Sequence, residues 1–168
     1  MKWLEESIMA KRGVGAGRKP VTHHLTEEMQ KEFHYTIGPY STPVLTIEPG
    51  DRIIVDTRDA FEGAINSEQD IPSQLLKMPF LNPQNGPIMV NGAEKGDVLA
   101  VYIESMLPRG VDPYGICAMI PHFGGLTGTD LTAMLNDPLP EKVRMIKLDS
   151  EKVYWSRRHT LPYKPHIG

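Results

Sequence analysis

The chain has 168 residues and a formal net charge of −3, which suits one ordinary domain and offers no broad basic face for nucleic acid. Its 15 Gly and 15 Pro exceed the usual combined share of about 12% and indicate many turns and short strands. No apolar run approaches the ~18 residues that span a bilayer, and the N-terminus lacks the apolar stretch of a secretory signal. We therefore expect a cytoplasmic protein that binds neither nucleic acid nor membrane.

Residues 1–22 differ in character from the rest of the chain. The stretch "MKWLEESIMAKR" has the character of a short helix, but the run "GVGAG" after it would break one, because glycine loses much conformational freedom when it is ordered. We predict a flexible leader over 1–22 and a single domain over 23–168.

From His23 onward, short apolar runs alternate with Pro and Gly. The run 33–37 alternates as a strand does, and 43–57 contains two strand-like runs hinged at Glu48-Pro-Gly-Asp51. Residues 87–106 repeat that arrangement. Several short strands at such spacing predict a β-sandwich or barrel.

Two Gly-Asp pairs each precede one of these runs. In each pair, the simplest interpretation is that Asp51 or Asp97 closes its turn by bonding to the neighbouring backbone.

One short helix is predicted over 129–142, because Thr129 or Asp130 can cap it and Asn136-Asp-Pro ends it. Strand character returns over 143–155, with a Ser-Glu-Lys turn between two runs. The single Cys117 lies between apolar neighbours, so we expect a buried thiol and a reducing compartment.

The stretch "VDTRDAFEGAIN", residues 55–66, ends a strand in a group of polar side chains: Asp56, Arg58, Asp59, Glu62 and Asn66. Carboxylates bind hard metal ions or act as general bases, and Asn supplies a carbonyl oxygen or an amide donor. The alternative is a solvated loop in which Arg58 pairs with a neighbouring acid.

None of the six histidines has the spacing of a known metal motif. His34 lies in the alternating run, where its face can meet an acid from another strand. His122 precedes two glycines that allow a backbone to approach a ligand closely, although a glycine-rich turn with a packed His explains the same pattern. No nucleophile signature such as GxSxG is present, so the residues favour a metal-assisted hydrolase over a covalent one.

Four strings in order closely resemble the acetamidase/formamidase family of amide hydrolases: "PVLTIEPGDRIIVDTRDAFEGAI", "NPQNGPIMVNGAEKGDVLAVYI", "IPHFGGLTG" and "LPYKPHIG". The resemblance runs from about His23 to Gly168. It implies a mainly β fold with jelly-roll-like sandwich character, oligomeric assembly, and hydrolysis of small linear amides to ammonia and a carboxylate.

The resemblance also implies site residues. Asp59 falls on a characteristic aspartate of the family and is expected to bind a divalent metal, zinc or calcium, or to orient the catalytic water, with His34 as a further metal ligand. Glu62 and Asn66 are expected to support catalysis. His122 and Gly124 are expected to contact the small amide substrate.

Family members continue beyond the point matched by Gly168 into an acid-rich motif with histidine. The resemblance thus implies an N-terminal half that is inactive alone, and that associates with further copies or with a complementing C-terminal half. The alternative is a non-catalytic β-sandwich binding module that keeps only the fold.

Overall fold

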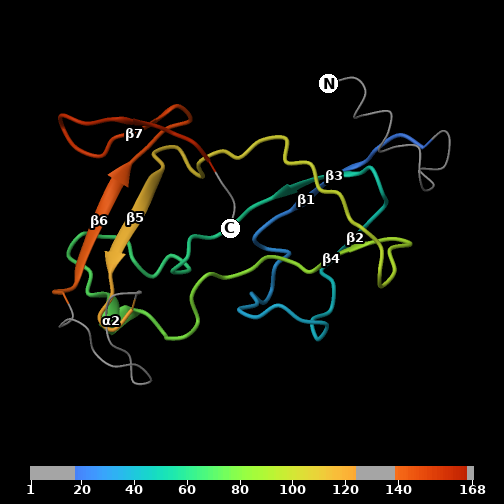
Figure 1. Cartoon of the computed structure of the whole chain (residues 1–168), viewed down its shortest axis with the longest axis horizontal. Helices are drawn as coiled ribbons and strands as arrows, with labels where there is room; N and C mark the ends of the chain where they lie inside the picture. Colours follow the sequence, from blue (N-terminus) through green and yellow to red (C-terminus); the bar gives the residue numbers. More distant parts are fainter. Residues whose placement is uncertain (1–17, 124–138, 166–168) are drawn as a thin grey trace. The chain divides into compact units, whose positions relative to one another are not determined.

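The computed structural model describes residues 18–123 and 139–165, whose regular secondary structure is nearly all strand (Figure 1). The strands form four two-stranded sheets among these residues. The mainly β class predicted from the sequence is therefore confirmed. The described residues divide into two compact units.

The first unit contains the described part of residues 1–59 together with Asn82–Leu99. Its strands are β1 (Thr22–Leu25), β2 (Leu45–Ile47), β3 (Arg52–Val55) and β4 (Ile88–Val90). They form two parallel pairs, β1 with β3 and β2 with β4. Both predicted runs around the Glu48–Asp51 hinge are thus strands.

The core of the first unit is small. Leu25 is fully buried, and Ile47 is 9% exposed. Gln30 is also buried. It accepts a hydrogen bond from the Gly86 N–H at 2.8 Å, and its Nε2 donates to the Gly86 carbonyl at 3.2 Å. This paired amide satisfies a buried polar group that would otherwise cost free energy.

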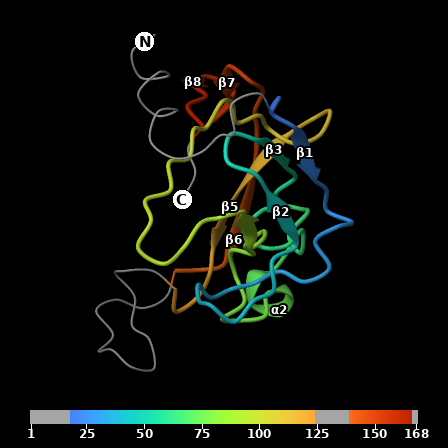
Figure 2. The same cartoon turned by 90° about the vertical axis from the view of Figure 1, so that its right-hand side faces the viewer.

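The second unit contains Ala60–Leu81 and the described residues from Ala100 onward. Strands β5 (Tyr114–Met119) and β6 (Lys142–Lys147) pair antiparallel, as do β7 (Lys152–Val153) and β8 (Leu161–Pro162). Strands β5 and β6 lie side by side in both views (Figures 1 and 2). The predicted Ser-Glu-Lys turn separates β6 from β7.

The buried side chains of the second unit are Ile65, Pro72, Val143 and Ile146. Its one described helix, α2 (Pro72–Leu75), has a proline in its first turn, where the missing N–H costs nothing. The helix predicted over 129–142 falls mostly on residues outside those described, and Lys142 belongs to β6.

Two predictions of local structure were wrong. The run 33–37 is not a strand and makes only one isolated bridge, between His34 and Gln84. Cys117 is exposed because β5 pairs with β6 alone in a sheet of two strands.

Residues 18–22, which the sequence placed in the leader, contact the rest of the first unit. Strand β1 begins at Thr22, and the Val21 N–H donates to Asp51 Oδ1 at 2.9 Å. Among the described residues no helix has both the length and the apolar character needed to cross a membrane.

Candidate functional site

The carboxyl ends of β1 and β3 bring polar side chains together, because parallel strands end at the same edge of their sheet. His24 pairs in register with Ile54, and the Asp56 N–H continues the ladder by donating to the Leu25 carbonyl at 3.1 Å. This register places His24 Nε2 3.0 Å from Asp56 Oδ1. Their side chains are 48% and 36% exposed, so solvent or a small molecule can reach them.

Arg58 lies two residues beyond Asp56 and forms an ion pair with Glu27, which follows β1. Its guanidinium carbon lies 4.6 Å from the centre of the Phe33 ring, a distance at which a cation is attracted to the face of an aromatic ring. Arg58 thus pairs with an acid, as the alternative interpretation expected, but this acid is 31 positions away in the sequence.

Asn85 joins the same region from the central "NPQNGP" string, since its Nδ2 donates to the Asp56 carbonyl at 3.1 Å. We call His24, Glu27, Asp56, Arg58 and Asn85 the strand-end cluster. In this cluster the His24 imidazole donates to the Asp56 carboxylate, and the Arg58 guanidinium pairs with Glu27. An imidazole oriented in this way can take up a proton through its other ring nitrogen, which is the requirement for a general base.

The sequence missed the pairing of His24 with Asp56. The two residues are 32 positions apart, and their contact follows only from the parallel register of β1 and β3. No local pattern in the sequence indicates this register.

Of the residues that the sequence predicted as metal ligands, Asp59 and His34 both belong to the first unit. Asp59 follows Arg58 and is exposed. His34 uses its Nδ1 in a hydrogen bond with Ser41 Oγ at 3.2 Å, so a metal ion would have to bind through its Nε2. Among residues 18–123 and 139–165, no three His, Cys, Asp or Glu side chains gather closely enough to hold a metal ion.

Glu62 and Asn66 belong to the second unit. Glu62 is exposed and has a φ of 54°, a conformation that is uncommon for residues other than glycine. Asn66 closes its own loop, because its Nδ2 donates to the Gly63 carbonyl at 2.6 Å and its N–H donates to Asp70 Oδ2 at 2.7 Å. Its Nδ2 donor is therefore already used within the loop.

His122 is exposed, with a φ of 56°, so it does not pack in a core as the alternative interpretation expected. Gly124 lies outside the described residues.

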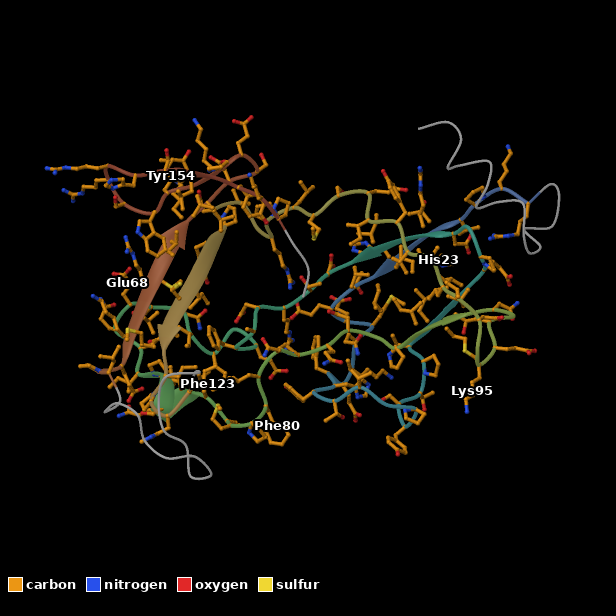
Figure 3. All side chains as sticks on the ribbon, in the orientation of Figure 1. His23, Glu68, Phe80, Lys95, Phe123 and Tyr154 are labelled. Carbon is orange, nitrogen blue, oxygen red and sulfur yellow. The ribbon has the colours of Figure 1, made fainter. Side chains whose placement is uncertain are left out.

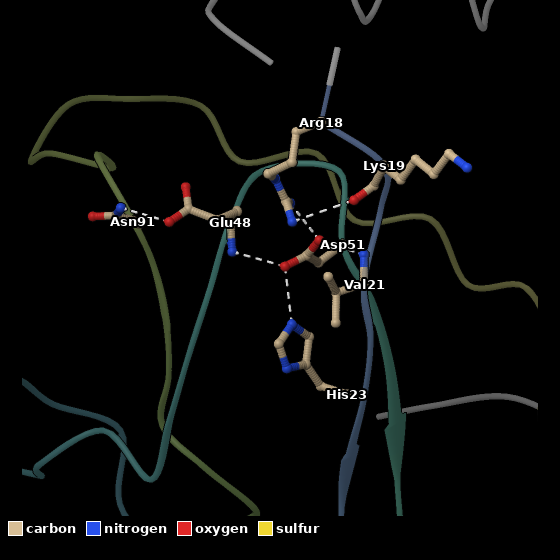
Figure 4. A network of polar contacts seen from close by, with 7 residues as sticks. All are labelled: Arg18, Lys19, Val21, His23, Glu48, Asp51 and Asn91. Atoms are coloured by element: carbon tan, nitrogen blue, oxygen red, sulfur yellow. Dashed lines mark hydrogen bonds and ion pairs between the residues drawn. The ribbon is translucent and has the colours of Figure 1, made fainter. Parts of the chain in front are cut away.

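A second polar group in the first unit surrounds Asp51 (Figure 4). The Asp51 side chain is 2% exposed and accepts hydrogen bonds from Val21 N–H at 2.9 Å, His23 Nε2 at 2.9 Å and Glu48 N–H at 3.1 Å, besides an ion pair with Arg18. Asn91 Nδ2 in turn donates to Glu48 Oε1 at 2.7 Å.

These contacts hold the pKa of Asp51 well below its usual range, with the Val21 N–H as the largest cause and burial acting in the opposite direction. The carboxylate is charged at neutral pH and surrounded by donors from two chain segments. Its role is structural: it joins the start of β1 to the turn before β3.

Comparison with known proteins identifies the family of this chain. The model of the acetamidase/formamidase family matches residues 20–162 of this chain. No curated protein matches it. An acetamidase from Yersinia enterocolitica, solved by crystallography, is 95% identical to this chain, with a TM-score of 0.89.

Two further crystal structures are more distant. An acetamidase from Bacillus halodurans is 23% identical, covers 83% of this chain and has a TM-score of 0.61. A predicted acetamidase/formamidase from Thermoanaerobacter tengcongensis is 23% identical, covers 86% and has a TM-score of 0.66. At that identity they support the fold alone.

The chain spans about half the length of these structures. The match covers 99% of this chain but 51% of the Yersinia chain, and it covers 42% and 43% of the other two.

Proposed function

Because the chain belongs to the acetamidase/formamidase family, we propose that it supplies about half of a hydrolase that cleaves small linear amides. The observation that carries this proposal is the family match over 20–162, supported by 95% identity to a protein described as an acetamidase. Formamide and acetamide are the substrates that the family description suggests. A cytoplasmic location fits a chain with one cysteine.

In this reaction a water molecule adds to the amide carbonyl carbon and the C–N bond breaks. One proton of the water passes to a general base and then to the departing nitrogen, so that the products are ammonia and a carboxylate. We assign the base to His24, supported by its 3.0 Å contact with Asp56 and its partial exposure. Asp56 acts as a positioning residue that orients the imidazole.

The residues implied by the family resemblance complete the proposal. Asp59 would orient the attacking water or bind a divalent ion, zinc or calcium, with His34. Glu62 and Asn66 would support catalysis, and His122 and Gly124 would contact the amide. Since the described residues gather no three metal-ligating side chains, they do not form a metal site on their own, and no step of the reaction is assigned to a metal.

The assignment of His24 is tested in the assembled enzyme, formed from this chain and the part of the Yersinia acetamidase that it does not cover. His24→Gln is expected to lower kcat for acetamide by about 10²–10⁴-fold, the usual contribution of a general base. Asp56→Asn should lower kcat with little change in KM, because it removes the carboxylate that orients the imidazole.

His159→Gln is the matched control, because His159 bonds only to its own loop through Ser156 in the described contacts. Its kcat is expected to stay within twofold of the unsubstituted enzyme. Equal turnover by the His24→Gln enzyme would remove His24 from the mechanism and leave the amidase proposal in place.

Asp59 is tested separately by Asp59→Ala in the same assembly. We expect turnover to fall, and bound metal to fall with it if Asp59 is a ligand. Unchanged metal content and unchanged turnover would exclude Asp59 from the site.

A further inference from the structure

The side chain of Gln30 holds one residue of the "NPQNGP" string by both of its backbone groups. Gln30 is 3% exposed, accepts a hydrogen bond from the Gly86 N–H at 2.8 Å and donates to the Gly86 carbonyl at 3.2 Å. Its Nε2 also donates to the Glu32 carbonyl. Gly86 has a φ of 91°, which favours glycine. One buried amide therefore fixes the backbone at Gly86.

The residues on both sides of Asn85 are held by the segment that follows β1. Gln84 exchanges two backbone hydrogen bonds with His34, at 2.8 and 3.3 Å, and Gly86 is held by Gln30. Between them, Asn85 donates from its Nδ2 to the Asp56 carbonyl at 3.1 Å. Asn85 thus connects a fixed segment of backbone to the residue that follows β3.

Asp56 is held on both sides of its α-carbon. Its N–H donates to the Leu25 carbonyl at 3.1 Å in continuation of the β1–β3 ladder, and its carbonyl accepts from Asn85. The direction of a side chain follows from the position of its backbone. These two contacts therefore keep the Asp56 carboxylate where its Oδ1 lies 3.0 Å from His24 Nε2.

The contact with Asp56 involves the second of two adjacent histidines in β1. His23, labelled in Figure 3, instead places its Nε2 2.9 Å from Asp51 Oδ2, because successive side chains of a strand point to opposite faces. His24 alone of this pair is thus directed to the end of β3 in the described contacts. Its orientation depends on where the chain after β3 places Asp56.

We propose that Gln30 and Asn85 are positioning residues of the amidase site, which act on His24 through the backbone of Asp56. The inference rests on the proposed function, because it takes His24 as the general base. Gln30 reaches Gly86 and Asn85 reaches the Asp56 carbonyl, so neither is assigned a proton transfer. A displacement of about 1 Å at a reacting group can cost roughly 100-fold in rate, which makes such positioning relevant to turnover.

Hydrogen exchange followed by NMR tests the structural part on the full 168-residue chain. Asn85→Ala is expected to speed exchange of the Asp56 amide about tenfold, because the carbonyl side of this residue is released. Exchange in β2 and β4, which pair with each other, should stay within about twofold. Unchanged exchange at Asp56, or equally faster exchange in β2 and β4, would overturn the proposal.

Asn91→Ala is the matched control. It removes the same amide group from the same stretch of the first unit, Asn82–Leu99, but Asn91 Nδ2 donates to Glu48 Oε1. Exchange at Asp56 should therefore be unchanged in this variant. An equal increase at Asp56 in the Asn85 and Asn91 variants would contradict a specific role of Asn85.

Gln30→Leu tests the first step of the chain of contacts. It keeps a side chain of similar size but leaves the buried N–H and carbonyl of Gly86 without their partner, which costs free energy. We expect faster exchange both at Gly86 and at Asp56. Faster exchange at Gly86 with unchanged exchange at Asp56 would overturn the role assigned to Gln30.

Kinetics of the assembled enzyme test the effect on turnover. Asn85→Ala is expected to lower kcat for acetamide roughly 10–100-fold with little change in KM, because it displaces the base without removing a contact to the amide. Asn91→Ala should leave both constants nearly unchanged. Unchanged kcat in the Asn85→Ala enzyme, or a raised KM alone, would contradict a positioning role.

A double substitution shows whether Asn85 acts through Asp56. In the Asp56→Asn enzyme, the further change Asn85→Ala should lower kcat by less than about twofold, because effects of residues that act as one unit are not additive. A further loss as large as that in the unsubstituted enzyme would show that Asn85 acts independently of Asp56, and would overturn the proposal.

Failure of the proposed function is recognised separately. No ammonia release by the unsubstituted assembly would contradict the amidase function, whereas the exchange measurements need no substrate and decide whether Gln30 and Asn85 hold Asp56 in place.

Discussion

Asp51 shows how one carboxylate can order two segments that are far apart in sequence. Its donors come from residues 18–23 and from the Glu48 N–H. Because its pKa is lowered on folding, its contribution to stability is fully present above the unfolded pKa of about 4 and is lost as pH falls through the folded value. Within the neutral range the contribution does not change.

Replacing Asp51 by Asn should therefore loosen the start of β1. We expect the Val21 amide to exchange at least about tenfold faster, because its acceptor at 2.9 Å becomes a neutral amide. Hydrogen exchange followed by mass spectrometry measures this. Asp97→Asn is the control, since it alters the equivalent turn and should leave exchange at Val21 unchanged; equal exchange in both variants would contradict the structural role of Asp51.

Tyr154 gives a pH-dependent prediction in the second unit. Its hydroxyl donates to Asp149 Oδ2 at 2.8 Å, and this bond to a carboxylate is the main reason that the pKa of Tyr154 is raised above its usual value of about 10. The bond stabilises the fold below that usual value and is lost as pH rises through the higher folded pKa.

Spectrophotometric titration of tyrosinate tests this prediction. The difference between the unsubstituted chain and Tyr154→Phe should show one phenol that ionises above its usual value of about 10, and Asp149→Asn should return it toward that value. If Tyr154 ionises at the same pH with and without the Asp149 carboxylate, the bond does not persist in solution.

The parallel pair β1–β3 brings the strand-end cluster together. Few buried side chains stabilise this pair. Leu25, at the end of β1, is fully buried, so Leu25→Ala is expected to cost about 2–5 kcal/mol of stability. Val21→Ala, at a side chain 48% exposed, should stay within about 0.5 kcal/mol. Urea unfolding measures both, and equal midpoints would mean that Leu25 is not packed in solution.

The sequence predicted the elements whose signals are local. The strands on both sides of Glu48–Asp51 follow from β-branched residues that flank a Pro-Gly turn. The prediction that Asp51 and Asp97 each close their turn by bonding to the neighbouring backbone is confirmed. The helix α2 has four residues, too few for periodicity to reveal.

Features that depend on distant partners could not be predicted. Residues 33–37 alternate as a strand does, but alternation specifies a half-buried surface and not a neighbouring strand, so only the His34–Gln84 bridge forms. The pairing of His24 with Asp56 depends on a parallel register that no local pattern encodes. The spacing of Asp59 indicates only a solvated loop, and its expected site role depends on the family resemblance.

At the scale of the whole molecule, the chain has the sequence of an amide hydrolase family over 20–162 but spans 51% of the length of its 95% identical relative. Among residues 18–123 and 139–165 few apolar side chains are buried.

The most direct test of the central claim is ammonia release from acetamide and formamide by three samples: this chain, the remainder of the Yersinia acetamidase, and an equimolar mixture. We predict release by the mixture, with equal amounts of ammonia and carboxylate, and none above background from either part alone. Sustained ammonia release by the 168-residue chain alone, or none from a mixture that forms a complex, would contradict the account.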